Sequence, residues 1–150
     1  MKTSSPLLQL LGLALLLAAT ARASAAPDET VVREMARQTN ISAEVIRRDH
    51  DACDSGVTMS MKVCASYRWR VQDARLNAVY KQARSKAHEM GYEASLVKAQ
   101  RAWVAYRDAV CANEGEMGAG GGTAQGLYEL SCMEGLTKDR INRIDAMLHS

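Results

Sequence analysis

A long apolar repeat in the middle of the sequence limits the fold more than any other feature. Between Ser60 and Ala87, residues at steps of three and four form one continuous face, and the basic residues lie off its centre. This spacing is the period of an α-helix. The face consists of Met61, Ala65, Trp69, Gln72, Leu76, Val79, Tyr80, Ala83 and Ala87. We therefore predict a helix from about Ser60 to Ala87 within an all-α fold.

Two further long helices are predicted after this one. His88 to Gly91 forms a turn, and Tyr92 to Cys111 continues with a helical pattern. Glycine favours the end of a helix, and so short a connection makes two helices antiparallel neighbours. We expect a glycine-rich loop over Ala112 to Gly122, and then a third helix from a Thr123 cap to about Leu148. The predicted architecture is an antiparallel helical hairpin plus a third long helix.

Residues 1–25 have the pattern of a secretory signal peptide. An apolar run from Leu7 to Ala19 precedes Ala23-Ser24-Ala25-Ala26, which has the small residues of a cleavage site. The run is too short for a membrane span. We expect cleavage after Ala25 or Ala26, and no cysteine follows that would carry a lipid anchor. The mature protein is therefore expected to be periplasmic or secreted.

Cleavage of the signal peptide also changes the charge of the chain. The full sequence has 19 basic and 17 acidic residues, and Lys2 and Arg22 precede the first acidic residue, Asp28. The mature chain therefore has 17 residues of each sign. A chain without net charge gives no reason to expect nucleic acid or an anionic membrane surface as a partner.

Residues 26–52 are predicted to form a helical amino-terminal arm in front of the main domain, residues 53–150. Asp28 can cap a first short helix, and Ser42 or Asn40 can cap a second. The arm has too few apolar residues to be stable alone, so we expect it to dock on the rest of the chain. Its expected buried residues are Val31, Val32, Met35, Val45 and Ile46.

Four cysteines, Cys53, Cys64, Cys111 and Cys132, predict two structural disulfides. An even number in an exported chain is typical of disulfides, whereas the scattered histidines and the lack of a C-x-x-C motif favour neither a metal nor a redox site. The hairpin brings all four sulfurs to its open end, so three pairings are open. We rank Cys53–Cys64 last because few residues separate them, and lean towards Cys64–Cys111 with Cys53–Cys132.

One side of the second predicted helix mixes polar and aromatic residues. Gln100, Trp103, Arg107 and Cys111 follow one another at steps of three and four. Residues at equal distances from the turn meet in a hairpin, which places Gln72 and Asp73 near Arg107. A buried guanidinium needs such a partner, because an unpaired buried charge is costly. We predict that Arg107 is buried and bonds to Asp73, Gln72 or a backbone carbonyl.

Three motifs on these helices point to a family. They are Leu76-Asn77 followed by Tyr80; Gln100-x-x-Trp103-x-x-x-Arg107-Asp108-x-x-Cys111; and Cys132 followed by Leu136-Thr137-x-x-Arg140. From about Cys53 to Leu148 the chain resembles the LprI-like lysozyme-inhibitor family. The resemblance implies a disulfide-stapled, all-helical exported domain that binds and inhibits lysozyme. The chain lacks the lipidated cysteine of the mycobacterial lipoprotein type. We interpret Leu76, Asn77, Tyr80, Gln100, Trp103, Arg107 and Asp108 as the scaffold of the family motif.

The favoured function is thus an exported protein-binding module that protects the cell wall by binding lysozyme. The alternative is a structural or adaptor domain of the bacterial envelope that binds another exported protein and has no effect on lysozyme. Inhibitors usually act through exposed elements on a rigid support. Glu114 and Glu116, on the predicted glycine-rich loop, are therefore the candidate partner-binding residues. The oligomeric state is left open.

An enzymatic function is not expected. A glycosidase needs two carboxylates about 5–9.5 Å apart across a cleft. Glu114 and Glu116 are close in sequence, but a glycine-rich loop would not hold them rigidly. No motif for a cofactor or a metal is present, since the glycine-rich stretch lacks the Gly-Lys-Ser/Thr of a phosphate-binding loop.

Overall fold

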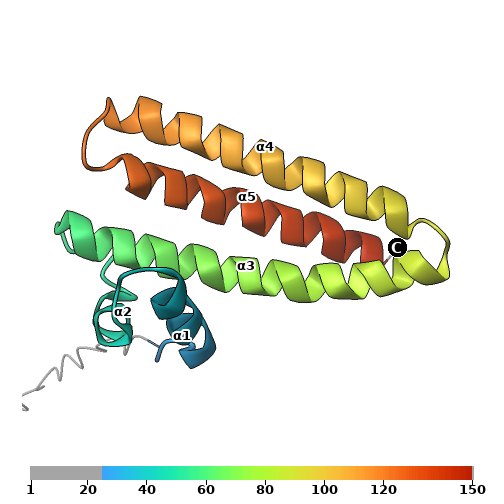
Figure 1. Cartoon of the computed structure of the whole chain (residues 1–150), viewed down its shortest axis with the longest axis horizontal. Coiled ribbons are helices and arrows are strands. Elements are labelled where there is room, and N and C mark those ends of the chain that lie inside the picture. Colours follow the sequence, from blue (N-terminus) through green and yellow to red (C-terminus); the bar gives the residue numbers. More distant parts are fainter. Residues whose placement is uncertain (1–24, 150) are drawn as a thin grey trace, which may run out of the picture.

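The computed structural model describes residues 25–149, which form five helices and no strand (Figure 1). The all-α fold is therefore confirmed. The predicted signal peptide lies outside the described residues, except for Ala25. The helices are α1 (Glu29–Gln38), α2 (Ala43–Asp49), α3 (Thr58–Glu89), α4 (Glu93–Ala119) and α5 (Gln125–Leu148).

The three long helices form a bundle in which α5 is the central member. Helices α3 and α4 are antiparallel, as predicted, and α5 runs parallel to α3 and lies between the two along most of their length (Figure 1). The apolar faces of α3 and α4 therefore meet α5 more than each other. The core of this bundle contains Leu76 and Ala83 of α3 and Ile141 and Ile144 of α5, all buried.

The turn between α3 and α4 has the expected glycine. Gly91 has a φ of 79°, in the left-handed region that residues with a Cβ rarely adopt. Beyond it, the amide of Tyr92 donates to the carbonyl of Ala87 across 2.9 Å, which satisfies an orphan carbonyl at the helix end. The short turn thereby fixes the antiparallel course of the two helices.

The glycine-rich loop predicted over Ala112 to Gly122 is wrong for most of its length, because α4 continues to Ala119. Gly115 is buried where α4 meets α5, and a Cβ there would lie 3.1 Å from the carbonyl oxygen of Gln125. A Cβ on Gly118 would lie 2.9 Å from the ring of Tyr128. These two glycines allow close helix packing rather than a mobile loop.

The connection to α5 is accordingly short. Gly120 and Gly121 have φ values of 54° and 79° and end α4. The predicted Thr123 cap is wrong: Ala124 precedes the first residue of α5, and no side chain caps the helix. Instead, the amide of Gln125 donates to the carbonyl of Gly122. The chain enters α5 through a backbone turn.

The amino-terminal arm, α1 and α2, packs on α3. The caps are as predicted: the Asp28 side chain accepts from the amides of Thr30 and Val31, and the Ser42 side chain accepts from the amide of Val45. The amide of Asp28 also donates to the Tyr67 hydroxyl across 2.7 Å. The buried cluster that joins the arm to α3 consists of Val31, Val32, Met35, Ile46, Val63 and Tyr67.

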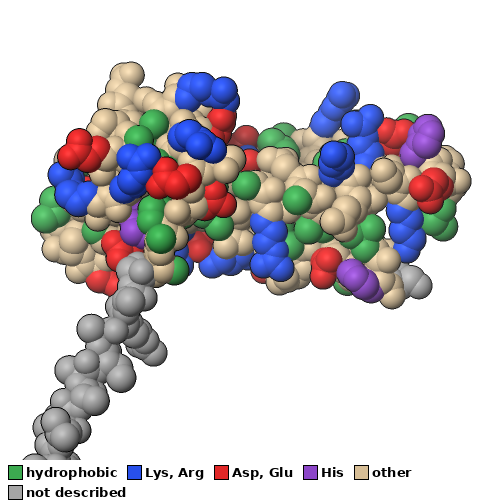
Figure 2. Space-filling view, turned by 90° about the horizontal axis from the view of Figure 1, so that it is seen from below, with side chains coloured by type: hydrophobic (Ala, Val, Ile, Leu, Met, Phe, Trp, Pro, Cys, Tyr) green, Lys and Arg blue, Asp and Glu red, His purple; other side chains and the backbone are tan. Residues whose placement is uncertain are grey.

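The arm forms a lobe over one half of α3, as Figure 2 shows. Acidic and basic side chains are interspersed on this lobe, without a large area of one sign. This mixture agrees with the balanced charge of the chain from residue 26 onwards.

Replacing Ile46 with alanine should detach the arm. The side chain is 0% exposed, and truncation of a buried isoleucine costs about 2–5 kcal/mol through lost apolar contact and the cavity left behind. We expect Ile46→Ala to lower the free energy of unfolding by about 2–4 kcal/mol and to speed amide exchange in α1 and α2. Val45→Ala, at a half-buried neighbour, should cost less than about 1 kcal/mol. Equal stability of the two variants would contradict the docking.

Both predicted disulfides are present, but the favoured pairing is wrong. The bonds are Cys53–Cys64, with 5.2 Å between the Cα atoms, and Cys111–Cys132, with 5.4 Å. The prediction assumed direct contact between α3 and α4. Because α5 lies between them, Cys111 meets Cys132 of α5 instead. The segment after α2 turns back along the start of α3, which brings Cys53 to Cys64.

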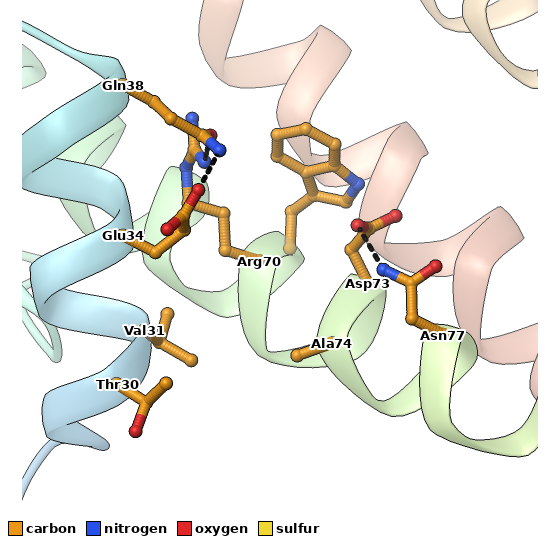
Figure 3. Close-up of a pocket in the computed structure, with 9 residues that line it drawn as sticks. Thr30, Val31, Glu34, Gln38, Arg70, Asp73, Ala74 and Asn77 are labelled. Atoms are coloured by element: carbon orange, nitrogen blue, oxygen red, sulfur yellow. Dashed lines mark hydrogen bonds between the residues drawn. The ribbon is translucent and has the colours of Figure 1, made fainter. Parts of the chain in front are cut away.

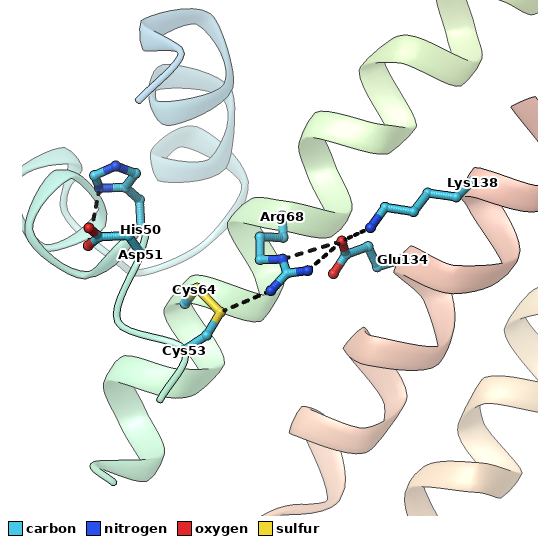
Figure 4. Close-up of a disulfide and its surroundings, with 7 residues drawn as sticks. All are labelled: His50, Asp51, Cys53, Cys64, Arg68, Glu134 and Lys138. Carbon is cyan, nitrogen blue, oxygen red and sulfur yellow. Dashed lines mark hydrogen bonds and ion pairs between the residues drawn. A yellow bond between two sulfur atoms is a disulfide. The ribbon is translucent and has the colours of Figure 1, made fainter. Parts of the chain in front are cut away.

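The disulfide Cys53–Cys64 lies beside an ion-pair network that connects α3 to α5 (Figure 4). Nη1 of Arg68 lies 3.8 Å from Sγ of Cys53. The same guanidinium donates to Oε1 of Glu134 through Nε (3.3 Å) and Nη2 (3.1 Å). Lys138 donates to the same oxygen of Glu134. Glu134 is buried, so its two cationic partners compensate its charge.

Candidate functional site

The family-motif arginine lies between two tryptophans. Arg107 of α4 is 6% exposed. Its Cζ is 5.7 Å from the ring centroid of Trp69 of α3 and 5.2 Å from that of Trp103 of α4. A guanidinium at this distance from an indole ring is attracted by the ring quadrupole. Arg107 therefore joins α3 and α4 where α5 otherwise separates them.

Two carboxylates neutralise Arg107. Nη1 lies 3.4 Å from Oδ1 of Asp73, and Nη2 lies 2.8 Å from Oδ1 of Asp108. Asp73 is thus the partner on α3, one of the predicted alternatives, and Asp108 is a second partner that the prediction missed. The side chains of Asp73 and Asp108 are 37% and 52% exposed. The guanidinium is buried, whereas its carboxylates reach the surface.

Two further arginines extend this arrangement. The Cζ of Arg70 lies 5.4 Å from the ring of Trp69, and the Cζ of Arg140 lies 5.7 Å from the ring of Trp103. Nε of Arg140 donates to Oε1 of Gln100 across 3.0 Å. Partial burial lowers the pKa of both guanidinium groups. We call the set Arg70, Trp69, Arg107, Trp103 and Arg140 the arginine–tryptophan row.

The remaining motif residues divide between core and surface. Leu76 is buried, and Tyr80 is half-buried against the same cluster. Asn77 is exposed, and its Nδ2 donates to Oδ2 of Asp73 across 3.2 Å. A chain of side-chain contacts therefore runs from Asn77 through Asp73 and Arg107 to Asp108. Through it, the polar part of the motif reaches the surface of α3 and α4.

A groove between α1 and α3 begins at this surface (Figure 3). Its volume is about 360 Å³. The half-buried Trp69 of the arginine–tryptophan row is one of its lining residues. The residues that line it are Thr30, Val31, Glu34 and Gln38 of α1, and Trp69, Arg70, Asp73, Ala74 and Asn77 of α3.

The sequence alone does not predict this groove. The lining residues on each helix follow steps of three and four, as the sequence from Arg70 through Ala74 to Asn77 shows. That spacing marks a face of a helix, but nothing in the sequence says which face of α1 lies opposite it. The groove is produced by the docking of the arm.

The candidate partner-binding residues lie elsewhere. Glu114 and Glu116 are exposed in the last turns of α4 and do not line the groove. They lie on a helix and not on the predicted glycine-rich loop. Loop flexibility is therefore not what excludes them as a catalytic pair. Residues two positions apart on a helix point about 200° away from each other. Glu114 and Glu116 therefore do not face a common cleft.

Comparison with known proteins places the bundle in a family. A family model described as Lysozyme inhibitor LprI matches residues 50–144. The chain belongs to the LprI family. A similar protein is the Uncharacterized protein R02472 of Rhizobium meliloti (strain 1021), which is 33% identical over 104 residues, 61% of this chain and 74% of the relative. No solved structure matches the chain significantly.

The LprI match covers α3, α4, most of α5 and both disulfides, whereas α1 and α2 precede it. LprI is named as an inhibitor family, which is consistent with a protein-binding rather than a catalytic role. Among residues 25–149, no helix combines the length and apolar character that crossing a bilayer requires. The α3 side of the groove thus lies within the residues that the family model matches, whereas the α1 side lies outside them.

Proposed function

We propose that the mature protein is an exported module, periplasmic or secreted, that binds a lysozyme and protects the cell wall from it. The observation that carries this proposal is the LprI match over most of the disulfide-stapled bundle. The bundle supports it physically, because a buried arginine held between two tryptophans and two disulfides make a rigid base for a binding surface.

Titration of the mature chain against a panel of lysozymes of different structural classes tests the proposal. We expect a Kd of about 1 μM or tighter for at least one of them, by calorimetry. A soluble oligomer of N-acetylglucosamine, which occupies the lysozyme cleft, should compete with the protein if the protein covers that cleft. Reduced and alkylated protein is the control and should bind more weakly.

Two results would contradict the proposal. One is the lack of a heat signal at about 100 μM with every lysozyme tested. The other is the recovery, from an envelope extract, of a different exported protein that binds with higher affinity than any lysozyme. The second result would favour the adaptor role, in which the same bundle holds another envelope protein.

A further inference from the structure

The side of α4 that faces away from the bundle has few charged residues. Helix α4 packs on α5 along its inner side and forms one edge of the molecule (Figure 1). A helix face in contact with water usually has charged and polar side chains. Between Arg101 and Glu114, however, the exposed residues of α4 include a single charged one, Asp108, which pairs with Arg107. The other exposed residues there are Ala102, Ala105, Tyr106, Ala109 and Asn113.

Large side chains extend this weakly polar surface. Tyr106 is 56% exposed and Met117 is 77% exposed. Steps of four, three and four lead from Tyr106 through Val110 and Asn113 to Met117, so these residues lie on one side of the helix, beside the exposed alanines. Single exposed apolar residues are common, but a continuous face over about three helical turns indicates a docking surface. We call it the outer face of α4, and it consists of Ala102, Ala105, Tyr106, Ala109, Val110, Asn113 and Met117.

The two ends of the outer face have opposite charges. Lys98 lies before its first residue and Glu116 lies at its other end, and both are exposed. Glu116 follows Lys98 by 18 residues, which is five turns at about 3.6 residues per turn, so both side chains project from the same side of α4. Neither has an ion-pair partner among residues 25–149. An occupant of the outer face could therefore supply an anion at one end and a cation at the other.

We propose that the outer face of α4 binds a second copy of this chain, with the two α4 helices antiparallel across a two-fold axis. Such an axis brings the same surface of both copies together in reverse order. With the axis level with position 107, midway between the two charges, Lys98 of each copy meets Glu116 of the partner subunit. The alanines of the two outer faces meet between these ion pairs, and the Tyr106 rings lie close to the axis.

Charge complementarity favours a second copy as the occupant, because the outer face is complementary to itself. Its one cation and its one anion lie at equal distances from its centre, so an antiparallel pair gives each charge a partner twice over. A parallel pair would place like charges together. The dimer leaves the amino-terminal arm free, since α1 and α2 pack on α3 at the opposite edge of the bundle (Figure 1). This inference is independent of lysozyme binding.

Sedimentation velocity of the mature chain at increasing concentration tests the inference. One helix face per copy is a small interface, so we expect a monomer–dimer equilibrium with a Kd of about 10–100 μM. Ala109→Arg places a large cation near the axis and should leave only the monomer. Ala78→Arg makes the same change at an exposed alanine of α3 and should dimerise like the wild type. Thermal unfolding should show that both variants remain folded.

Two charge reversals test the antiparallel pairing itself. Lys98→Glu and Glu116→Lys each place like charges against one another at both ends, so each variant alone should dimerise at least about tenfold more weakly than the wild type. An equimolar mixture of the two variants should associate about as tightly as the wild type, because the acidic ends of one then meet the basic ends of the other.

Three results would overturn the inference. The first is a wild-type chain that stays monomeric up to about 500 μM. The second is a dimer that Ala109→Arg leaves unchanged, because the copies would then meet through another surface. The third is a mixture of Lys98→Glu and Glu116→Lys that associates no more tightly than either variant alone.

Discussion

The variant Arg107→Ala should unfold with a free energy about 3 kcal/mol lower than that of the wild type. The substitution removes a guanidinium that fills the space between Trp69 and Trp103, and so leaves a cavity as well as two unpaired carboxylates. Because Asp73 and Asp108 are partly exposed, water can solvate the carboxylates that the substitution leaves without Arg107. The loss of stability is therefore smaller than for a fully buried ion pair. Urea unfolding followed by circular dichroism measures it.

Arg107→Lys is the matched control for this prediction. It keeps the charge but loses the planar group that contacts both rings, so we expect an intermediate loss of about 1–2 kcal/mol. A stability equal to that of the wild type in Arg107→Ala would show that the arginine–tryptophan row does not hold α3 to α4. The residue would then be free for a direct role in binding.

Removing the disulfide Cys111–Cys132 should have an effect of similar size. The bond closes a loop with a sequence separation of 21 residues, and loss of such a constraint costs about 3 kcal/mol in the chain-entropy model. The double variant Cys111→Ala with Cys132→Ala avoids a buried hydroxyl at Cys111, which is fully buried. We expect a lower urea midpoint with the fold retained.

The other disulfide is the natural comparison. Cys53–Cys64 has a sequence separation of 11, so its removal should cost about 0.5 kcal/mol less in the same model. Peptide mapping of the non-reduced protein should recover the pairs Cys53–Cys64 and Cys111–Cys132. Recovery of Cys64 with Cys111 would contradict the position of α5 between α3 and α4.

The helices could be predicted because each depends on local pattern. The period of the apolar residues placed α3 within two residues at each end, and Asp28, Ser42 and Gly91 marked the ends of their helices through side-chain caps and a positive φ. The burial of Arg107 also followed from sequence, with Asp73 as one of three possible partners, because a short turn fixes the register of an antiparallel pair.

The features that depend on packing between distant segments could not be predicted in the same way. Gly115 and Gly118 look like loop residues in sequence, whereas their role is to let α5 approach α4. The position of α5 decides the disulfide pairing, and nothing local encodes it. Val63 and Tyr67 contact the arm from a second apolar face of α3. This face is hard to recognise in the sequence because the main apolar face of the helix dominates the pattern. The groove between α1 and α3 could not be predicted either, because it forms only when the arm docks on α3.

The proposed inhibition of a lysozyme by this LprI-family module can be measured as a change in the rate of cell-wall lysis. Turbidity of a bacterial cell-wall suspension is followed with a lysozyme that binds the mature protein, at increasing concentrations of that protein. We predict that the lysis rate falls in a saturable way, with a midpoint near the Kd measured in solution. An unchanged lysis rate at protein concentrations well above that Kd would contradict the proposed function.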